Sequence, residues 1–426
     1  MLIRFEAENL FSFAQAQELS LVASKLKDHE DGLRLIPGTS GLRAVPAALI
    51  YGANASGKSN LISAFMFMTC AILFSHSRWS PDDGVPRVPF ALDDESNDGL
   101  SRCEVEFVVD DRRYVFGFTF DNHSFITEWL YDFPEGKRRK QYERESNEVE
   151  FGQSMRGAKK HLVEFMRPNS LFISTATQND HIELSKIVGF FRSIQFCDTL
   201  AVSPATVGRM FTDGRVDVRT IAFLRDTGTG VVGQEQREKK LPERLTKLGS
   251  RLREVFREQL GDEYADGLHI GDNGAEMMLR HQGSKKEYTL PLRRESAGTL
   301  RLLVLMGEVL SALDKGTVLI IDELDTSLHT LVAEQIVELF SDPRHNPRGA
   351  QLIATTHDTN VLACKHLRRD QVWFCEKDDA GASHVFSLAE FKLRSKDNFE
   401  RGYLEGRFGA IPFAGNLGAL LEAKAS

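Results

Sequence analysis

The sequence of 426 residues is 42% hydrophobic and 27% charged, with a formal net charge of −8 and a pI of about 5.9. This composition is typical of a globular protein with room for two or three domains. It excludes a chain that is basic throughout, although a local basic face for nucleic acid stays compatible with it. The five cysteines include no CxxC pair, so we expect reduced thiols and neither a disulfide framework nor a zinc site.

No membrane span or export signal is predicted. No stretch contains the roughly 18 consecutive apolar residues that suggest a membrane helix. The first residues, Met1–Glu6, are too charged for a signal peptide and fit a first strand. We therefore expect a cytoplasmic protein without a membrane partner.

The first sixty residues predict strands that lead into a phosphate-binding loop. Residues 1–23 alternate apolar and polar, as in a half-buried hairpin, residues 24–46 read as loop, and residues 47–51 form a short apolar strand. Residues 52–59, GANASGKS, match the P-loop pattern G-x-x-x-x-G-K-[ST], and apolar residues at helical spacing follow to about residue 76. The order of strand, glycine loop and helix is what makes this motif specific.

The residue types of the loop fit a nucleoside triphosphate. Glycines let successive backbone N–H groups point at the β-phosphate, in front of the positive end of the helix. We expect the nucleotide to be bound by Gly52, Asn54, Gly57, Lys58 and Ser59. Lys58 would reach the β- and γ-phosphates and the Ser59 hydroxyl would hold the metal, so the expected cofactors are ATP and Mg²⁺.

The middle of the chain predicts antiparallel strands followed by helices. Residues 77–99 read as a surface loop, and residues 104–109, 113–120 and 125–131 as antiparallel hairpins. The basic run 137–140 is a solvated turn or a DNA contact. Residues 158–167 and 181–193 predict helices, and residues 200–230 read as irregular. Residues 234–260 predict a charged amphipathic helix, which is a packed helical subdomain, a DNA-touching arm or a partner-docking face.

The last third predicts a buried parallel sheet and a second acidic motif. A helix over 299–313 precedes an apolar strand at 317–321, and a helix over 330–340 and a strand at 351–355 follow. The strand 317–321 ends at Asp322 and Glu323, which is the Walker B pattern. We expect Asp322 to join the Mg²⁺ shell and Glu323 to polarise the attacking water.

The motifs that follow resemble those of an ABC-type ATPase head. Leu324–His329 reads L-D-x-x-L-H and Thr355–Asp358 reads T-T-H-D. This order is similar to that of the branch containing RecF, the SMC proteins and the OLD-type ATPases. The resemblance implies that Asp325 and Ser327 lie in the D-loop, which meets the P-loop of the other subunit. It also implies that His357 contacts the γ-phosphate.

Two further elements of such heads have candidates in this sequence. Ser296 and Gly298 open the helix before Walker B and resemble the signature that binds the γ-phosphate of the partner subunit, with a simple capping turn as the alternative. Gln178 lies in the interval where the resemblance implies a glutamine that senses the nucleotide and its metal. Asn9–Phe13 resembles the segment N-F-R-S-F but lacks its arginine, so a phosphate contact there is in doubt.

A finer resemblance covers nearly the whole chain. Pro89–Asp93, Glu128–Tyr131 and Tyr403–Phe413 are similar to segments of the prokaryotic AAA15 family, which includes RloA-type proteins of phage-defence loci. Residues 403–413 are a docking element or a packed tail. OLD proteins continue into a TOPRIM nuclease after the His switch, whereas Glu376–Asp379 reads as a hairpin turn here. We therefore expect no built-in nuclease and a separate nuclease-like effector.

Together these features predict an α/β P-loop NTPase of the ABC-type head class. We expect an antiparallel β lobe with the P-loop (1–200), a helical insertion (201–264) and a parallel-sheet lobe with signature, Walker B, D-loop, His switch and tail (265–426). Two ATP molecules would lie between the heads of a head-to-tail homodimer, and the ATPase would sense infection and control the effector. The alternatives are a RecF-like DNA-binding clamp for repair and a scaffold that binds ATP but barely hydrolyses it.

Overall fold

The computed structural model describes residues 1–27, 29–157, 159–198, 202, 207, 216–239, 244, 247–248, 251, 254, 274–326, 328–364, 367–393 and 398–411. The chain divides into two compact units, each described by itself. One comprises Met1–Asp198 with Ser311–Ser426, and the other comprises Thr199–Leu310. The predicted boundaries at 200 and 264 divide the chain differently, and that three-part division stays a prediction.

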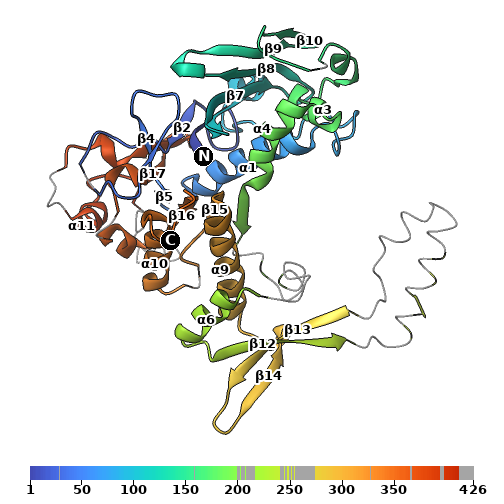
Figure 1. Ribbon diagram of the computed structural model, residues 1–426. Coiled ribbons are helices and arrows are strands. Elements are labelled where there is room, and N and C mark those ends of the chain that lie inside the picture. Colours follow the sequence, from blue (N-terminus) through green and yellow to red (C-terminus); the bar gives the residue numbers. More distant parts are fainter. Residues whose placement is uncertain are drawn as a thin grey trace, which may run out of the picture. The chain divides into compact units, whose positions relative to one another are not determined.

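The first unit contains a seven-stranded antiparallel sheet in the order β10-β9-β8-β7-β6-β1-β2 (Figure 1). The strands are β1 (Leu2–Glu8), β2 (Gln17–Ser20), β6 (Ser101–Val109), β7 (Arg112–Phe120), β8 (Phe125–Asp132), β9 (Arg139–Glu145) and β10 (Glu148–Phe151). The predicted hairpins are confirmed, because β1 pairs antiparallel with β2, and β7 pairs antiparallel with β6 and β8. The segment predicted as loop after β2 carries two short strands, β3 (Arg34–Leu35) and β4 (Arg43–Ala44).

The same unit contains a six-stranded sheet in the order β11-β15-β16-β5-β17-β18. Its strands are β11 (Gln195–Asp198), β15 (Val318–Asp322), β16 (Gln351–Thr355), β5 (Ala47–Tyr51), β17 (Val372–Lys377) and β18 (Ser383–Ser387). All neighbours pair in parallel except β17 and β18, which form the predicted hairpin. Every residue of β5 and β16 is buried, as expected for strands covered on both faces. The predicted parallel sheet is confirmed.

Helix α1 (Lys58–Phe74) fills the space between the two sheets (Figure 1). Its buried Leu61 and Phe65 belong to one core with Phe5 of β1 and Ile320 of β15. The other helices of this unit are α2 (Asp94–Asp98), α3 (Phe172–Gln178), α4 (Ile182–Ser193), α10 (Thr330–Ser341) and α11 (Phe399–Leu404). Short 3₁₀ turns are η1 (Pro134–Gly136), η2 (His161–Phe165), η4 (Thr359–Ala363), η5 (Arg369–Gln371) and η6 (Leu388–Glu390). The helix predicted over 158–167 is thus only the 3₁₀ turn η2.

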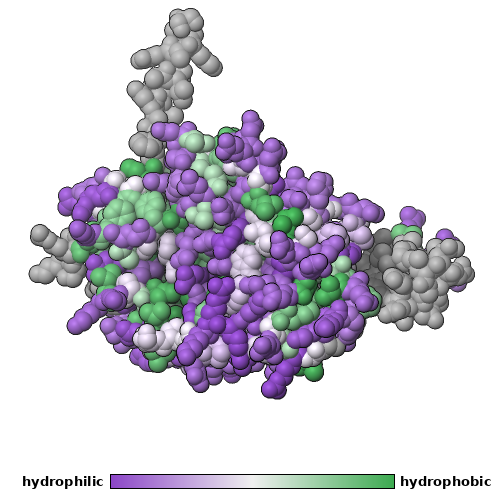
Figure 2. Space-filling model, turned by 90° about the horizontal axis from the view of Figure 1, so that it is seen from above, coloured by the Kyte–Doolittle hydropathy of each residue, from purple (hydrophilic) through white to green (hydrophobic). Residues whose placement is uncertain are grey.

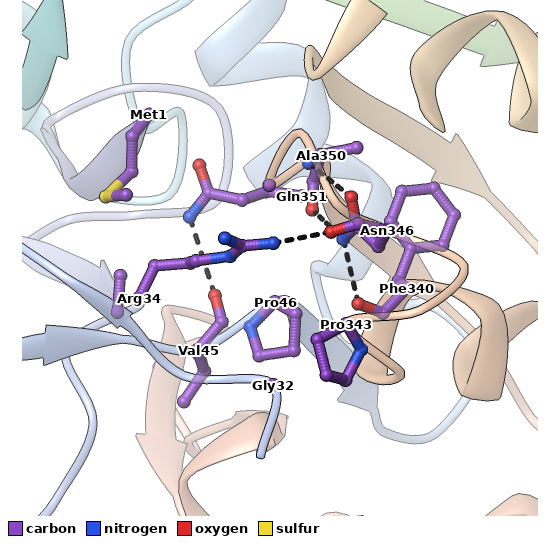
Figure 3. A pocket seen from close by; sticks show the side chains of 12 residues that line it. Met1, Gly32, Arg34, Val45, Pro46, Phe340, Pro343, Asn346, Ala350 and Gln351 are labelled. Atoms are coloured by element: carbon purple, nitrogen blue, oxygen red, sulfur yellow. Dashed lines mark hydrogen bonds between the residues drawn. The ribbon is translucent and has the colours of Figure 1, made fainter. Parts of the chain in front are cut away.

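One glutamine ties the two sheets together. The Gln351 side chain of β16 accepts a hydrogen bond from the Leu2 backbone N–H at 2.6 Å and donates to the Leu2 carbonyl at 2.9 Å. Figure 3 shows Gln351 beside a small pocket, where Arg34 donates to the Asn346 carbonyl at 2.6 Å. The Asn346 amide in turn donates to the carbonyls of Phe340 and Ala350, both at 2.8 Å. This polar network orders the turn that leads into β16.

The second unit is built on a three-stranded antiparallel sheet in the order β12-β13-β14. Elements whose bounds lie within its described residues are α6 (Val218–Asp226), β12 (Val231–Lys239), β13 (Gly274–Gln282), β14 (Glu287–Pro291) and η3 (Leu292–Arg294). Helix α9 (Ala297–Lys315) crosses the unit boundary at residue 310 and confirms the helix predicted over 299–313.

Two predictions for this unit are corrected. Helix α6 lies within residues 200–230, which were predicted to be irregular. Residues 234–239 are strand and not helix, because they pair along β13, from Gln234 with Leu279 to Lys239 with Gly274. The helical stripe of leucines begins only at Leu245, so the periodicity never covered 234–239, and strand pairing outweighs local propensity there.

The rest of the predicted helix 234–260 lies mostly outside the described residues. Five described residues of that range are helical, namely Arg244, Lys247, Leu248, Arg251 and Glu254.

The face seen in Figure 2 is mainly hydrophilic, with hydrophobic residues in separate groups. In the described part of the chain, no helix has the length and apolarity that crossing a membrane requires.

Candidate functional site

A cavity of about 390 Å³ lies at the carboxyl ends of β5, β15 and β16. It is lined by Asn54, Ala55, Ser56, Gly57, Lys58, Ser59, Asn60, Glu323, His357 and Lys377. Ligands of open parallel sheets bind outside the carboxyl ends of the strands. The parallel sheet therefore brings the predicted P-loop, the predicted general base and the predicted switch histidine to one cavity.

The P-loop adopts a strained backbone that needs its glycines. Gly57 has φ of +114°, and a Cβ there would lie 2.9 Å from the Ser12 hydroxyl oxygen and closer still to Ser383. Ala55 also has positive φ, at +61°. This curled loop directly precedes α1, whose first backbone N–H groups are free of intrahelical partners and suit an anion.

Lys58 is held at the floor of the loop. Its ammonium donates to the carbonyls of Gly52 and Ala53, both at 2.9 Å. Burial lowers the pKa of this ammonium, while nearby acids, including Asp322, oppose the shift. A buried positive charge held by neutral carbonyls is poised for a negatively charged ligand.

The back of the P-loop is supported by residues from distant parts of the chain. The Ser56 carbonyl accepts hydrogen bonds from the Cys375 thiol of β17 at 3.2 Å and the Ser383 hydroxyl of β18 at 2.6 Å. Burial raises the pKa of the Cys375 thiol to about 11, so it remains a donor. The Ser12 hydroxyl oxygen accepts from the Asn60 amide at 2.8 Å and lies 2.8 Å from the Ser383 hydroxyl oxygen.

Ser12 of the segment resembling N-F-R-S-F thus contacts Asn60, the residue directly after the P-loop, and Ser383, which supports the loop. In the sequence, only the match of Ser12 to the serine of N-F-R-S-F pointed to this contact. Asn9 of the same segment organises residues 90–100, since its amide donates to the carbonyl of Ser96 at 2.5 Å and its oxygen accepts from the Phe90 N–H at 3.1 Å.

Thr355, the first residue of the T-T-H-D motif, to which the sequence analysis assigned no role, links the two Walker B acids. The Thr355 hydroxyl, at the end of β16, donates to Asp322 Oδ1 at 2.6 Å and accepts from the Glu323 N–H at 2.7 Å. Glu323 has φ of +55°, and its carboxylate accepts from the Thr326 hydroxyl at 2.8 Å. These contacts fix the acids at the end of β15. In the sequence, the feature that pointed to this role was a polar residue at the end of the otherwise apolar strand that follows Walker B.

The predicted D-loop and switch histidine contact each other. Asp325 Oδ1 accepts from the His357 backbone N–H at 3.0 Å. Partial burial and then the Lys58 charge lower the pKa of the His357 imidazole, against the effect of the acids. The lowered pKa favours the neutral form of the ring. Ser327, the other predicted D-loop residue, lies outside the described residues.

The oxygen donors near the cavity fit Mg²⁺. Ser59 supplies a hydroxyl and Asp322 a carboxylate, and Mg²⁺ characteristically takes one or two carboxylates together with waters and phosphate oxygens. Among the described residues, no group of three or more His, Cys, Asp or Glu gathers into a metal cluster of its own.

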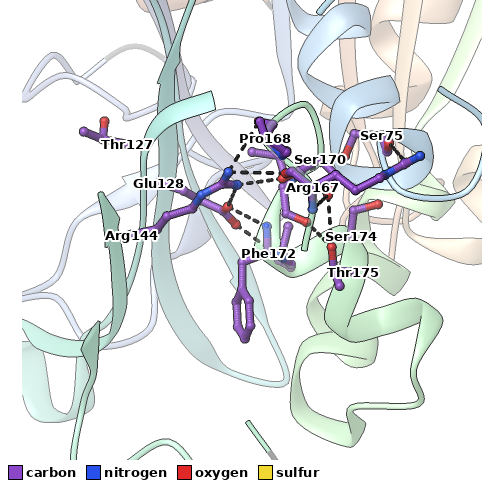
Figure 4. Close-up of polar contacts among 12 residues, drawn as sticks. Ser75, Thr127, Glu128, Arg144, Arg167, Pro168, Ser170, Phe172, Ser174 and Thr175 are labelled. Atoms are coloured by element: carbon purple, nitrogen blue, oxygen red, sulfur yellow. Dashed lines mark hydrogen bonds and ion pairs between the residues drawn. The ribbon is translucent and has the colours of Figure 1, made fainter. Parts of the chain in front are cut away.

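Gln178 is the exposed last residue of α3 and is not among the residues that line the cavity. The start of the same helix is held by a buried carboxylate (Figure 4). Glu128 accepts from the N–H groups of Phe172 at 2.6 Å and Ile173 at 3.0 Å, and pairs with Arg144 at 3.5 Å. Glu128, the first residue of the segment Glu128–Tyr131, thus anchors α3, while the metal role of Gln178 stays a prediction.

The predicted signature residues belong to the second unit. The exposed Ser296 caps α9, because its hydroxyl oxygen accepts from the Thr299 N–H at 3.0 Å. Gly298 lies in the first turn of α9. This geometry is that of a simple capping turn, the alternative to a signature motif, and binding of the partner's nucleotide by Ser296 and Gly298 stays a prediction.

Residues 403–411 pack against β17. Tyr403 stacks on Phe374 with ring centroids 5.4 Å apart, and its hydroxyl donates to the Ala410 carbonyl at 2.9 Å. The Ala410 N–H donates to Glu376 Oε2 at 2.9 Å. These contacts are those of a packed tail, whereas Pro412 and Phe413 lie outside the described residues.

These features define a P-loop NTPase with the ABC-type head fold. A protein-family model described as "AAA domain, putative AbiEii toxin, Type IV TA system" matches residues 47–154 and 211–363, more than half of the chain. The chain belongs to this family of AAA-domain proteins, and it is a P-loop ATPase by that membership. The finer AAA15 assignment is a proposal.

Comparisons with other proteins add only distant likenesses. No curated protein matches the chain. Among 81 matching chains of solved structures is "Crystal structure of the SmcHead bound to the C-winged helix domain of ScpA", with 14% identity and a TM-score of 0.38. That likeness covers 91% of this chain and 97% of the other. At this distance it says nothing of what the chain does.

Proposed function

We propose that the chain binds ATP with Mg²⁺ in the P-loop cavity and hydrolyses it. The observation that carries this proposal is the convergence of Lys58, Glu323 and His357 on one cavity at the carboxyl ends of neighbouring parallel strands. A cation can neutralise the charge of a triphosphate, a carboxylate can orient and deprotonate the attacking water, and an imidazole N–H can donate to a phosphate oxygen.

The roles follow from the contacts. Lys58 and the loop N–H groups neutralise the phosphates, and Ser59 and Asp322 would hold the metal, which supplies charge neutralisation at the phosphate oxygens. Glu323 takes the proton of the attacking water. The new bond forms between the water oxygen and the γ-phosphorus, the bond to the β,γ-bridging oxygen breaks, and ADP and phosphate leave.

A kinetic comparison of three variants tests this assignment. Glu323→Gln should lower kcat by about 10²–10⁴-fold with ATP still bound, as expected for loss of a general base. Lys58→Ala should abolish ATP binding, and Glu338→Gln, at an exposed site on α10, should behave as wild type. Unchanged turnover of Glu323→Gln would contradict its role as base, and unchanged ATP affinity of Lys58→Ala would contradict the P-loop assignment.

We further propose that ATP joins two copies head to tail, with Ser296 and Gly298 of one copy closing the site of the other. The helix N-terminus that Ser296 caps offers backbone N–H groups to a γ-phosphate. The Glu323→Gln variant should double its mass by light scattering when ATP is added. Ser296→Glu should bind ATP but remain monomeric, because a carboxylate repels the phosphate. A dimer that forms equally with Ser296→Glu contradicts this arrangement.

We place the activity in anti-phage defence, as a regulator of a separate nuclease-like effector in the cytoplasm. The resemblance of three segments to the AAA15 family supports this placing, as does the family description, which refers to a toxin of a type IV toxin–antitoxin system. Cells carrying the chain with its neighbouring genes should resist phage plating, and Lys58→Ala should remove that resistance. A stable complex with a neighbouring nuclease-like product, formed without DNA, supports the regulator.

The DNA-clamp alternative receives little support from the basic run 137–140. Arg139 pairs with Asp132 at 2.6 Å, Lys140 pairs with Glu150 at 2.7 Å, and Arg138 lies 3.7 Å from the centroid of the Tyr131 ring. The two ion pairs offset the positive charges of Arg139 and Lys140, which reduces the attraction of this run for phosphate. Salt-dependent binding of duplex DNA by the isolated protein would nevertheless favour the clamp.

A further inference from the structure

The β17–β18 hairpin forms a fixed wall beside the P-loop. Strand β17 pairs in parallel with the P-loop strand β5, with Phe374 opposite Tyr51. One residue from each strand of the hairpin, Cys375 and Ser383, donates to the Ser56 carbonyl of the loop. The hairpin is therefore positioned by backbone and side-chain contacts with the phosphate-binding loop itself.

Lys377 is the last residue of β17 and carries a charge into the cavity. Its register partner across the hairpin is Ser383, which contacts the loop directly. The Lys377 side chain is exposed and lines the same cavity as Lys58. Within the described ranges, no hydrogen bond or ion pair is recorded for its ammonium, whereas the Lys58 ammonium is held by two carbonyls.

We propose that Lys377 is a second phosphate-binding cation of this cavity, which contacts the polyphosphate of the bound nucleotide. This inference rests on the proposed nucleotide binding at the same site. A nucleoside triphosphate brings several negative charges, and the cavity already contains the Glu323 carboxylate. An ammonium on a flexible four-carbon stem reaches a phosphate as a point charge, in the way that lysines commonly bind phosphate.

The tail of residues 403–411 braces the strand that carries this lysine. Successive side chains of a strand point to opposite faces. Glu376 accordingly binds the Ala410 N–H, and Lys377 lines the cavity. Tyr403 stacks on Phe374 of the same strand and also contacts Tyr51 of the P-loop strand, with ring centroids 6.0 Å apart. Residues 403–411 thus act as a positioning element for Lys377.

Calorimetric titration of the full chain with ATP, ADP and AMP tests the proposal. Lys377→Ala should raise the Kd for ATP about 10-fold, as expected for loss of one charge-assisted contact. The effect should shrink from ATP to AMP, and the slope of log Kd against log salt should fall. Lys377→Arg, which keeps the charge, should restore most of the affinity. Lys186→Ala, at an exposed lysine on α4, should bind as wild type.

The outcomes separate this inference from the proposed function. Failure of the wild-type protein to bind ATP would overturn both. The role of Lys377 alone would be overturned by a different result: the wild type binds ATP, Lys58→Ala abolishes that binding, and the Kd of Lys377→Ala for ATP stays within about twofold of wild type. Equal losses of ATP and AMP affinity would assign Lys377 to another part of the nucleotide and would also overturn the proposal.

Discussion

Removing the Glu128 carboxylate should release the start of helix α3. Glu128 is buried in the first unit, and accepts from the Phe172 and Ile173 N–H groups and from the Tyr142 hydroxyl, the last at 2.7 Å. Its ion-pair partner Arg144 has no exposed side-chain surface and also donates to the Ser170 carbonyl at 2.6 Å. The pair therefore clamps the chain just before and within the first turn of α3 (Figure 4).

The magnitude follows from what Glu128→Ala leaves behind. It leaves the Arg144 guanidinium without its carboxylate partner, in a site where burial already lowers the pKa of that guanidinium. It also leaves two backbone N–H groups without an acceptor. Breaking a buried ion pair by removing one partner costs about 3–5 kcal/mol. Each stranded donor costs about 1–3 kcal/mol, but these terms overlap. We expect a total of about 4 kcal/mol for opening of α3.

Hydrogen exchange of the Phe172 and Ile173 amides measures this directly. A loss of about 4 kcal/mol corresponds to exchange roughly 10³-fold faster, since each 1.4 kcal/mol is a factor of ten. Glu128→Gln, which keeps an acceptor, should show a smaller effect. Glu150→Gln, at the exposed end of a surface pair on the same sheet, should leave the exchange unchanged. Exchange within about threefold of wild type in Glu128→Ala would refute the reasoning.

A second readout connects this clamp to the site. Helix α3 ends at Gln178, the residue predicted to sense the nucleotide and its metal. If that prediction holds, Glu128→Ala should lower ATP turnover while ATP binding by the P-loop persists. Faster exchange with unchanged turnover would leave the clamp in place as a structural feature and contradict the role of Gln178.

Three further predictions concern the loop, the switch and the second unit. Gly57→Ala should abolish ATP binding measured by calorimetry, because Gly57 has φ of +114° and lacks room for a Cβ. Gly41→Ala, at φ +88° in open space, is the control, and retained ATP affinity in Gly57→Ala would contradict phosphate binding by this loop conformation. An NMR titration of His357 should give a midpoint below 6.5, because burial lowers the pKa of its imidazole, and a midpoint at or above 6.5 contradicts the assignment. As the pH falls through 6.5, the unfolded chain binds more protons than the folded chain, so this group should make the fold less stable in acid. Ser296→Ala should destabilise α9 by about 1 kcal/mol in thermal melts, because its hydroxyl caps the helix, and an unchanged melt would show that the cap contributes nothing.

The sequence by itself predicted the chemistry of the site and the type of most elements. The P-loop and Walker B are local patterns, in which a few adjacent residues set both the conformation and the chemistry. The apolar runs 47–51, 317–321 and 351–355 predict buried strands, because strands covered on both faces lack alternation. The helix prediction at 234–239 was wrong because local propensity carries no information on strand pairing with β13.

Only the tertiary structure decided which distant residues meet at the P-loop. Strand β5 lies between β16 and β17, and that order depends on pairing between segments more than 300 residues apart. Ser383 donates to the carbonyl of Ser56, which lies 327 residues away in the chain, and Lys377 reaches the cavity through the same hairpin. Such contacts leave no periodic or motif signal, because each residue's own neighbours are compatible with many partners. The cradle around Lys58 therefore follows from packing, whereas its ability to bind phosphate could be predicted from eight consecutive residues, 52–59.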